Sequence, residues 1–275
     1  MELPQPTTPA GKAGLTALLD DPSGAVVALD FDGTLAPIVD DPEAARADTD
    51  AVLALSRLAP HLDAVVIVTG RPAAVAVAYG RFAGVPGLDR LVVLGHYGLE
   101  RWDAVSGRVH APDVPPGVDA VRAQLPGVLS GLGLWETTWT EDKGSALAVH
   151  TRRAPDPQGA FDALRAPLAA LAHDHGLVVE PGRYVLELRP AGMDKGQALT
   201  AFLAERGARS VLFAGDDLGD LAAFDAVERL RGDGVAGVTV CSGSAEVSEL
   251  AERADVVVDG PPGVAALLAA LADAV

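Results

Sequence analysis

Short runs of Val, Leu and Ile recur along the chain, and they constrain its fold more than any other feature. They lie at residues 26–30, 64–70, 91–95, 210–217, 237–243 and 254–260. Runs this apolar are typical of strands that are buried on both faces of a sheet. Stretches of helical length and propensity separate them, for example residues 48–59 and 71–82. This alternation predicts an α/β fold with a doubly wound parallel sheet.

The middle of the chain departs from this pattern. Its expected strands are longer and alternate apolar with polar residues, at 134–142, 144–152 and 177–190. The last of them contains a hairpin signal at Pro181-Gly182, and helices are expected at 117–130 and 157–175. We therefore predict a parallel-sheet core made of residues 1–104 and 191–275, interrupted by an inserted α+β cap domain at residues 105–190.

Composition excludes several classes of partner. The net charge of −17 argues against binding to nucleic acid or to an anionic membrane. The single Cys241 excludes an internal disulfide and is typical of a reducing compartment. No apolar run is long enough to span a bilayer, and the first residues lack the apolar core of a signal peptide. The expected location is the cytoplasm.

Two aspartates follow the first apolar run directly, in the sequence ALDFDGT. In parallel sheets the carboxyl ends of the strands form the ligand crevice, and residues two apart on an extended chain point to the same side. Asp30 and Asp32 would therefore address one small site, and Gly33 would allow a tight turn after them. Close carboxylates repel each other unless a cation lies between them, and Mg²⁺ suits carboxylate and phosphate ligands. The alternative is that both aspartates simply cap a turn.

A second acidic cluster ends another apolar run, in the sequence LFAGDDLGD. It contains Asp216, Asp217 and Asp220. One acid at a helix start is ordinary capping chemistry, but three in five residues exceed what a cap requires. If the two runs are neighbouring strands, the carboxylates of both clusters converge, and a cation is needed between them.

Two further segments carry groups that suit an anion. Lysine is rare in this arginine-rich chain, yet Lys195 opens an expected helix in DKGQAL, where its ammonium could neutralise carboxylates and hold a phosphate oxygen. Thr69, Gly70 and Arg71 follow the second apolar run and offer a hydroxyl, backbone N–H groups and a helix start. A solvated lysine and an ordinary helix start are the alternatives.

The segments DFDGT, VTGR, DKG and GDDLGD, in this order, resemble the four motifs of the haloacid dehalogenase superfamily of phosphohydrolases. The expected insert lies where that superfamily carries its type C2 caps. Within the superfamily the chain is similar to the trehalose-6-phosphate phosphatase family, on the stretches LDFDGTLAPIVDDPEAA, LGHYGLE, EDKGSALAVHTR and LELRPAGMDKGQAL. It departs from many members at His96-Tyr97-Gly98, where they have Asn-His-Gly. It also departs at residues 218–221, where only Asp220 matches the usual Thr-Asp-Glu-Asp.

The resemblance implies Mg²⁺-dependent hydrolysis of trehalose 6-phosphate through an aspartyl-phosphate. It makes Asp30 the nucleophile and Asp32 the general acid and base, while Thr69 and Lys195 hold phosphoryl oxygens. Gly70 and Arg71 are further candidates for substrate binding. The expected metal ligands are the carboxylate of Asp30, the backbone carbonyl of Asp32, and Asp216, with Asp217 or Asp220 as a further ligand or support.

The insert is expected to select the substrate. The resemblance implies that Glu141, Lys143 and Glu187 contact the sugar, and His150 is a further candidate. The alternative for each is a solvated or structural position. Arg183 and Arg189 are additional candidates for phosphate or sugar contacts. Trp135 and Trp139 are four residues apart on one expected strand, so they would share a face, where packing competes with stacking on a sugar ring.

Two other functions stay open at this level. The chain could hydrolyse a different sugar phosphate, such as sucrose-phosphate or a mannosyl- or glucosyl-phosphoglycerate, or it could be a non-catalytic regulatory module. The intact acidic clusters and Lys195 argue against the module, because a non-catalytic protein has no need for such a costly array of charges. The expected partners are a small sugar phosphate as substrate and a trehalose-phosphate synthase.

Overall fold

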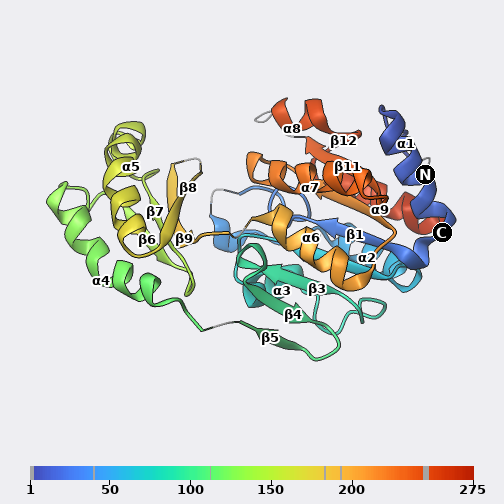
Figure 1. Ribbon diagram of the computed structural model, residues 1–275, viewed down its shortest axis with the longest axis horizontal. Coiled ribbons are helices and arrows are strands. Elements are labelled where there is room, and N and C mark those ends of the chain that lie inside the picture. Colours follow the sequence, from blue (N-terminus) through green and yellow to red (C-terminus); the bar gives the residue numbers. More distant parts are fainter. Residues whose placement is uncertain (1–2, 40, 112, 183, 193, 244–247) are drawn as a thin grey trace. The chain divides into compact units, whose positions relative to one another are not determined.

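The computed structural model describes residues 3–39, 41–111, 113–182, 184–192, 194–243 and 248–275. It divides into two compact units (Figure 1). The core unit comprises Met1–Ala111 together with Met193–Val275, and the inserted unit is Pro112–Gly192. The insert therefore starts later than the expected residue 105, because residues 100–110 still pair with the sheet of the core unit.

The core unit is built on one large sheet with the strand order β12-β11-β10-β1-β2-β3-β4-β5. The parallel strands are β1 (Ala25–Leu29), β2 (Ala64–Val68), β3 (Val92–Gly95), β10 (Ser210–Gly215), β11 (Ala236–Gly243) and β12 (Val256–Asp259). Two short antiparallel strands, β4 (Glu100–Asp103) and β5 (Arg108–His110), extend one edge. The predicted α/β class is confirmed, with a mostly parallel sheet.

Helices cover both faces of this sheet (Figure 1). One face packs against α1 (Pro9–Asp20), α2 (Thr49–Leu58), α3 (Ala73–Gly80) and α9 (Gly260–Ala274). The other packs against α6 (Lys195–Arg206), α7 (Leu221–Gly232) and α8 (Ser248–Arg253). Along β1, Val27 and Leu29 enter the first hydrophobic cluster while Val26 and Ala28 enter the second. Burial on both faces explains why the strand sequence is apolar without alternation.

The start of α6 is fixed by a local sequence signal. Asp194 is the N-cap residue, and its carboxylate accepts a hydrogen bond from the backbone N–H of Gln197. Gly207 ends the helix in the left-handed conformation, with φ of 61°. Lys195 is therefore the first helical residue.

No helix in the described part of the chain combines the length and the apolar character that crossing a membrane requires.

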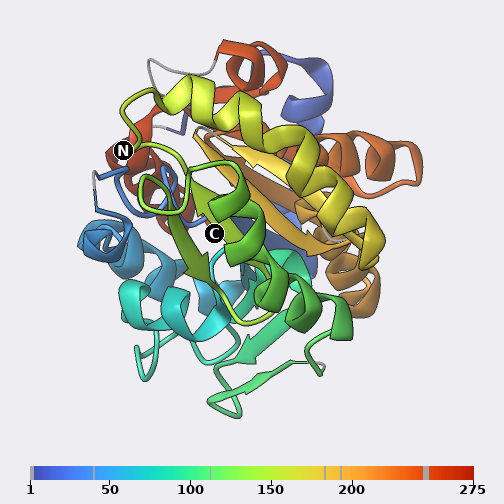
Figure 2. The same ribbon diagram turned by 90° about the vertical axis from the view of Figure 1, so that its left-hand side faces the viewer.

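The inserted unit is a four-stranded antiparallel sheet with the order β6-β7-β9-β8. Its strands are β6 (Trp139–Asp142), β7 (Leu147–His150), β8 (Leu177–Gly182) and β9 (Val185–Pro190). The helices α4 (Pro116–Gly131) and α5 (Pro157–Asp174) pack side by side against it (Figure 2). Leu147, Val149, Leu186 and Leu188 point into this small core. The residues between them lie on the opposite face, which explains the alternating sequence pattern.

One expected strand is shorter than predicted. Residues 135–137 form turns after α4, because the carbonyl oxygen of Leu134 accepts hydrogen bonds from the backbone N–H groups of Thr137 and Thr138. Strand β6 begins only at Trp139. The prediction that Trp135 and Trp139 share the face of one strand is therefore wrong.

Candidate functional site

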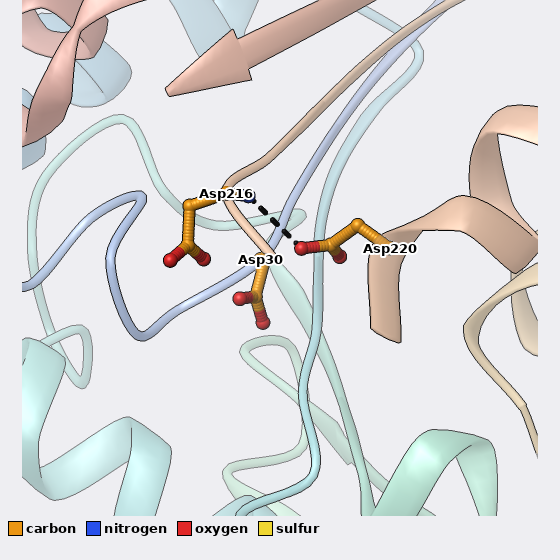
Figure 3. A group of neighbouring side chains, drawn as sticks. All are labelled: Asp30, Asp216 and Asp220. Carbon is orange, nitrogen blue, oxygen red and sulfur yellow. Dashed lines mark hydrogen bonds between the residues drawn. The ribbon is translucent and has the colours of Figure 1, made fainter. Parts of the chain in front are cut away.

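Adjacent strands bring the two acidic clusters together. Strands β1 and β10 pair in parallel, with Leu29 opposite Ala214, so both acidic segments leave the same edge of the sheet. Asp30, Asp216 and Asp220 each place a carboxylate oxygen within 4.8 Å of the others, and all three residues are buried (Figure 3). The condition set by the sequence, that the two runs be neighbouring strands, is met.

A single ammonium group lies among these carboxylates. Lys195 Nζ is 2.9 Å from Asp30 Oδ1 and 2.7 Å from Asp220 Oδ1. The other oxygen of Asp220 accepts hydrogen bonds from the backbone N–H groups of Asp216 and Asp217, at 3.0 and 3.2 Å. Both oxygens of Asp220 are therefore engaged, and this residue fixes Lys195 against the turn that carries Asp216.

The loop after β1 is fitted closely against Asp216. Gly33 has a φ of 72°, and a Cβ atom at this position would collide with the Asp216 carboxylate. Only glycine satisfies both demands. The Ser242 hydroxyl, at the end of β11, donates a hydrogen bond of 2.6 Å to the Gly33 carbonyl oxygen. Ser242 was missed by sequence reasoning, since a lone serine in a strand gives no signal.

The electrostatics of the cluster favour a bound cation. Burial raises the pKa of Asp216 to about 8, and the charges of Asp220 and Asp217 add to this effect. Burial alone would lower the pKa of Lys195, but Asp220 and Asp30 outweigh it and raise the pKa well above its usual value. Lys195 thus stays charged against three carboxylates. Asp216 Oδ1 is buried and has no hydrogen-bond partner among the described residues. Such a set of oxygens suits a divalent cation.

Asp32 lies apart from this cluster. Its carboxylate forms a two-pronged ion pair with Arg71, with Nε–Oδ2 at 2.6 Å and Nη2–Oδ1 at 2.7 Å. The side chain of Asp32 is 41% exposed, whereas that of Asp30 is 6% exposed. The chain turns after Leu29, so the rule for extended residues two apart does not carry through to Asp32. The expected carboxylate pair is therefore split between two partners.

Asp217 also lies outside the group of three carboxylates. It is exposed, and its side chain caps a short 3₁₀ turn, Leu218–Asp220, by accepting a hydrogen bond of 2.9 Å from the Gly219 N–H. The sequence left Asp217 and Asp220 as alternatives. The geometry places Asp220, and not Asp217, in the group of three carboxylates, because the turn directs the Asp220 side chain back toward Lys195.

The segment Thr69–Arg71 lies directly after β2. Thr69 is buried, and its hydroxyl oxygen accepts a hydrogen bond of 3.1 Å from the Arg71 N–H. The start of α3 is a candidate anion site on sequence grounds, but Glu100 already occupies it. Its Oε2 accepts a hydrogen bond of 2.7 Å from the Ala73 N–H. Sequence reasoning missed Glu100, although it closes the conspicuous stretch LGHYGLE.

The inserted unit gathers its candidate residues on the face of the sheet away from α4 and α5. Lys143 Nζ lies 2.5 Å from Glu187 Oε2, and His150 Nε2 lies 3.0 Å from Glu141 Oε2. Glu187 is 7% exposed, and its other oxygen, Oε1, has no hydrogen-bond partner among the described residues. The four predicted residues thus form two adjacent pairs, one of which retains a buried acceptor.

Two of the four remaining candidates of the insert have structural partners. The ring of Trp139 lies 4.5 Å from that of His150, tilted by 30°, which favours packing for this tryptophan. Trp135 lies in the turn after α4. Arg189 donates a hydrogen bond of 2.9 Å to Glu180. Arg183 lies outside the described residues.

The mostly parallel sheet with aspartates at its strand ends has the fold of haloacid dehalogenase-like hydrolases. A solved hydrolase of this kind from Bacteroides thetaiotaomicron matches with a TM-score of 0.59 and 20% identity, over 89% of this chain and 98% of that one. The chain belongs to the trehalose-phosphatase family, whose model matches residues 28–259. The prediction of the family is confirmed, the fold agrees with the predicted superfamily, and the family is one of phosphatases.

Two further likenesses support the assignment to this family. The trehalose-phosphate phosphatase of Mycobacterium avium is 38% identical over 90% of this chain. The match covers 62% of that relative, so the chain spans less than two thirds of its length. The C-terminal domain of the Candida albicans trehalose-6-phosphate phosphatase has a TM-score of 0.74 at 22% identity, with 99% of both chains covered. At this identity the structural match shows the fold alone.

Proposed function

We propose that this protein hydrolyses trehalose 6-phosphate to trehalose and inorganic phosphate, with Mg²⁺ as its cofactor. The observation that carries the proposal is the position of Asp30. It is buried, lies 2.9 Å from a charged lysine and shares its site with Asp216, in a chain of the trehalose-phosphatase family. A carboxylate so placed is suited to attack a phosphate ester that a cation and an ammonium group hold in position.

Asp30 and Asp216 are the proposed metal ligands. Asp216 offers an oxygen without a hydrogen bond to a described residue, whereas both oxygens of Asp220 are engaged by Lys195 and by two backbone N–H groups. Asp220 would therefore support the site from behind. Bound Mg²⁺ would supply positive charge to the phosphoryl oxygens. The backbone carbonyl of Asp32 stays a proposed ligand from the family resemblance.

The proposed reaction has two steps. In the first, an oxygen of Asp30 forms a bond to phosphorus while the bond from phosphorus to the sugar oxygen breaks, and Asp32 gives a proton to that oxygen. In the second, Asp32 takes a proton from water, whose oxygen attacks phosphorus and releases Asp30. Lys195 and the Thr69 hydroxyl would stabilise the charge on the phosphoryl oxygens in both steps.

The ion pair with Arg71 gives Asp32 a defined starting position. It keeps the carboxylate beside the nucleophile segment but directed at a guanidinium group, at 2.6 Å. To give a proton to the leaving oxygen, Asp32 has to leave this ion pair and first take up a proton from solvent. Arg71, once released, offers donors to the incoming phosphate, which is the substrate-binding role that we propose for it and for the backbone of Gly70.

The polar face of the inserted unit would bind the sugar. A buried acceptor without a hydrogen bond costs about 1–3 kcal/mol, and Glu187 Oε1 is such an acceptor within the described chain. A sugar hydroxyl would satisfy it. Glu141, Lys143 and His150 offer further donors and acceptors beside it. We propose that these residues choose the substrate, and that the inserted unit is the specificity domain.

Phosphate release from trehalose 6-phosphate, with Mg²⁺ and with EDTA, tests the proposal. We expect rapid release with Mg²⁺ and a loss of activity with EDTA. Sucrose-phosphate and glucosyl-phosphoglycerate should be poorer substrates by at least about tenfold in kcat/KM, because buried polar groups left without partners are costly. Hydrolysis of an aryl phosphate without hydrolysis of trehalose 6-phosphate would point to another sugar. No release from any ester would point to a non-catalytic module.

We also propose the cytoplasm as its location and a trehalose-phosphate synthase as the enzyme that supplies its substrate. The support is the family and the single cysteine, which is buried at Cys241 and whose pKa is raised to about 11, chiefly by burial. Cell fractionation and co-purification with the synthase test these two points. Recovery from the periplasm or medium would contradict the first.

A further inference from the structure

The loop after β3 contains consecutive residues in the left-handed conformation. His96, Tyr97 and Gly98 have φ values of 46°, 56° and 96°. For residues other than glycine this conformation costs roughly 1–2 kcal/mol each. Strain of this kind persists only where the surroundings impose it, and it concentrates at functional positions. Two adjacent residues of this kind therefore indicate that the loop holds a functional group in a fixed position.

The loop is fastened to the segment proposed to bind phosphate. The Tyr97 N–H donates a hydrogen bond of 2.9 Å to the carbonyl oxygen of Thr69, and the His96 N–H donates one of 2.9 Å to that of Arg71. Glu100 adds a third connection, because its carboxylate binds the start of α3 and lies 3.6 Å from the His96 ring. Two backbone hydrogen bonds thus join the strained loop to the Thr69–Arg71 segment.

The side chain of Tyr97 lies over Gly70, between Thr69 and Arg71. A Cβ atom on Gly70 would come within 2.6 Å of the Tyr97 hydroxyl oxygen and 2.8 Å of the ring carbon that bears it. The phenol therefore occupies the space that any other side chain at residue 70 would need. Tyr97 is only half-buried, and it follows β3, a strand of the core sheet.

We propose that Tyr97 is a phosphate-binding residue, whose hydroxyl donates a hydrogen bond to a phosphoryl oxygen of the substrate and of inorganic phosphate. This rests on the part of the proposed function that assigns phosphate to the Thr69–Arg71 segment. A fixed, neutral donor suits a site that already contains three carboxylates and one ammonium group. The two backbone hydrogen bonds to Thr69 and Arg71 hold the loop in place before the ligand arrives, so little ordering is left for the binding step.

The variant Tyr97→Phe tests the hydroxyl, because it keeps the ring over Gly70. We expect the inhibition constant of inorganic phosphate to rise about three- to tenfold, as for the loss of one hydrogen bond. The KM values for trehalose 6-phosphate and for an aryl phosphate should rise by the same factor. The matched control is Tyr79→Phe, on α3, which likewise removes a phenolic hydroxyl and keeps the ring. It should change none of these constants.

Each other outcome overturns the proposal. Unchanged constants in Tyr97→Phe would make this residue a packing element of Gly70. A rise in KM for trehalose 6-phosphate alone would place the hydroxyl on the sugar. Calorimetric titration of the wild-type protein with inorganic phosphate separates this inference from the proposed function. Phosphate binding that depends on Tyr97 supports the inference even if the physiological ester proves to be another one, and absence of binding refutes it.

The contact between Tyr97 and Gly70 has its own test in stability. Gly70→Ala should lower the urea midpoint of unfolding in the wild-type chain, because the new methyl group meets the phenol. In a Tyr97→Ala background the same substitution should cost clearly less, since the phenol is gone. Equal costs in the two backgrounds would show that the ring does not cover Gly70 in solution.

Discussion

At the scale of single residues, the site depends on which oxygen atoms are already engaged. Asp220 is completely buried, and both of its oxygens accept hydrogen bonds. Asp216 retains an oxygen without one in the described chain, and Asp30 meets Lys195. Residues of one type thus take different tasks: in the proposed site Asp30 and Asp216 bind the ligand, and Asp220 holds the lysine. Asp32 forms an ion pair with Arg71.

Asp30→Asn should abolish turnover while the fold is retained. The amide keeps the size of the side chain but lacks the charge for attack on phosphorus, so kcat should fall by at least about a thousandfold. Phosphate release measures the loss, and circular dichroism checks the fold. Activity close to that of the wild-type protein would remove Asp30 from the role of nucleophile.

Asp220→Asn and Asp217→Ala should differ sharply in stability. The first removes a charge from a fully buried pair with Lys195, which should cost about 3 kcal/mol of unfolding free energy. The second removes an exposed cap of a short turn and should cost about 1 kcal/mol. Urea unfolding with saturating Mg²⁺ measures both. Similar costs would contradict the distinction between the two aspartates.

At the scale of elements, the site depends on the order of the strands. Strand β10 lies beside β1, which brings Asp216 to Asp30, and β11 lies beside β10, which brings Ser242 to the loop after β1. Segments about 200 residues apart in the chain therefore meet at one edge of the sheet. The hydroxyl of Ser242 connects the loop after β1 to a strand that supplies no carboxylate to the cluster among the described residues.

Ser242→Ala should weaken Mg²⁺ binding without unfolding the protein. The Gly33 carbonyl would lose its hydrogen bond, and the loop would no longer be fixed against Asp216. We expect a loss of about 1–2 kcal/mol of stability and a rise of several-fold in the Mg²⁺ concentration for half-maximal activity. Ser242→Thr, which keeps the hydroxyl, should restore the metal dependence.

Ser210→Ala is the matched control for this change. Ser210 is also buried. It is the first residue of β10, at the end of the strand far from Asp216, and its hydroxyl has no hydrogen-bond partner among the described residues. Its loss should leave the Mg²⁺ dependence unchanged. If both serine variants shifted this dependence alike, general softening of the sheet would explain the effect, and Ser242 would have no specific role.

At the scale of the whole molecule, the buried acidic cluster couples stability to pH and to metal. The pKa of Asp216 is about 8 in the fold, against an ordinary value of 3.8. Its contribution to stability is fully present below about pH 4 and is lost as the pH rises through 8, because the fold favours the protonated form. The metal-free protein should therefore become less stable as the pH rises from about 4 to about 8, the window between the two pKa values.

Urea midpoints measured with EDTA across this range test the prediction. In Asp216→Asn, which cannot ionise, the decline with pH should be smaller. Saturating Mg²⁺ should largely abolish the decline in the wild-type protein, since the cation replaces the proton and binds more tightly as the pH rises. A wild-type profile that matches Asp216→Asn in EDTA would show that Asp216 does not titrate in this way.

Much of the fold and part of the site could be predicted from the sequence. Apolar runs such as residues 26–30 specify strands that are buried on both faces, and the aspartates after them necessarily reach the carboxyl edge of the sheet. The short motifs also sufficed to identify the family. These features are local: strand burial, a helix cap at Asp194 and the position of an acid after a strand all follow from a few neighbouring residues.

The directions of the side chains were decided only by the tertiary structure. The sequence could not show that Asp220 rather than Asp217 meets Lys195, or that Glu100 occupies the start of α3. Nor could it show that Ser242 holds Gly33. Each of these contacts depends on the turn that a residue adopts and on a partner from a different segment of the chain. Local patterns determine where a residue lies along its element, whereas packing between distant elements determines what that residue can touch.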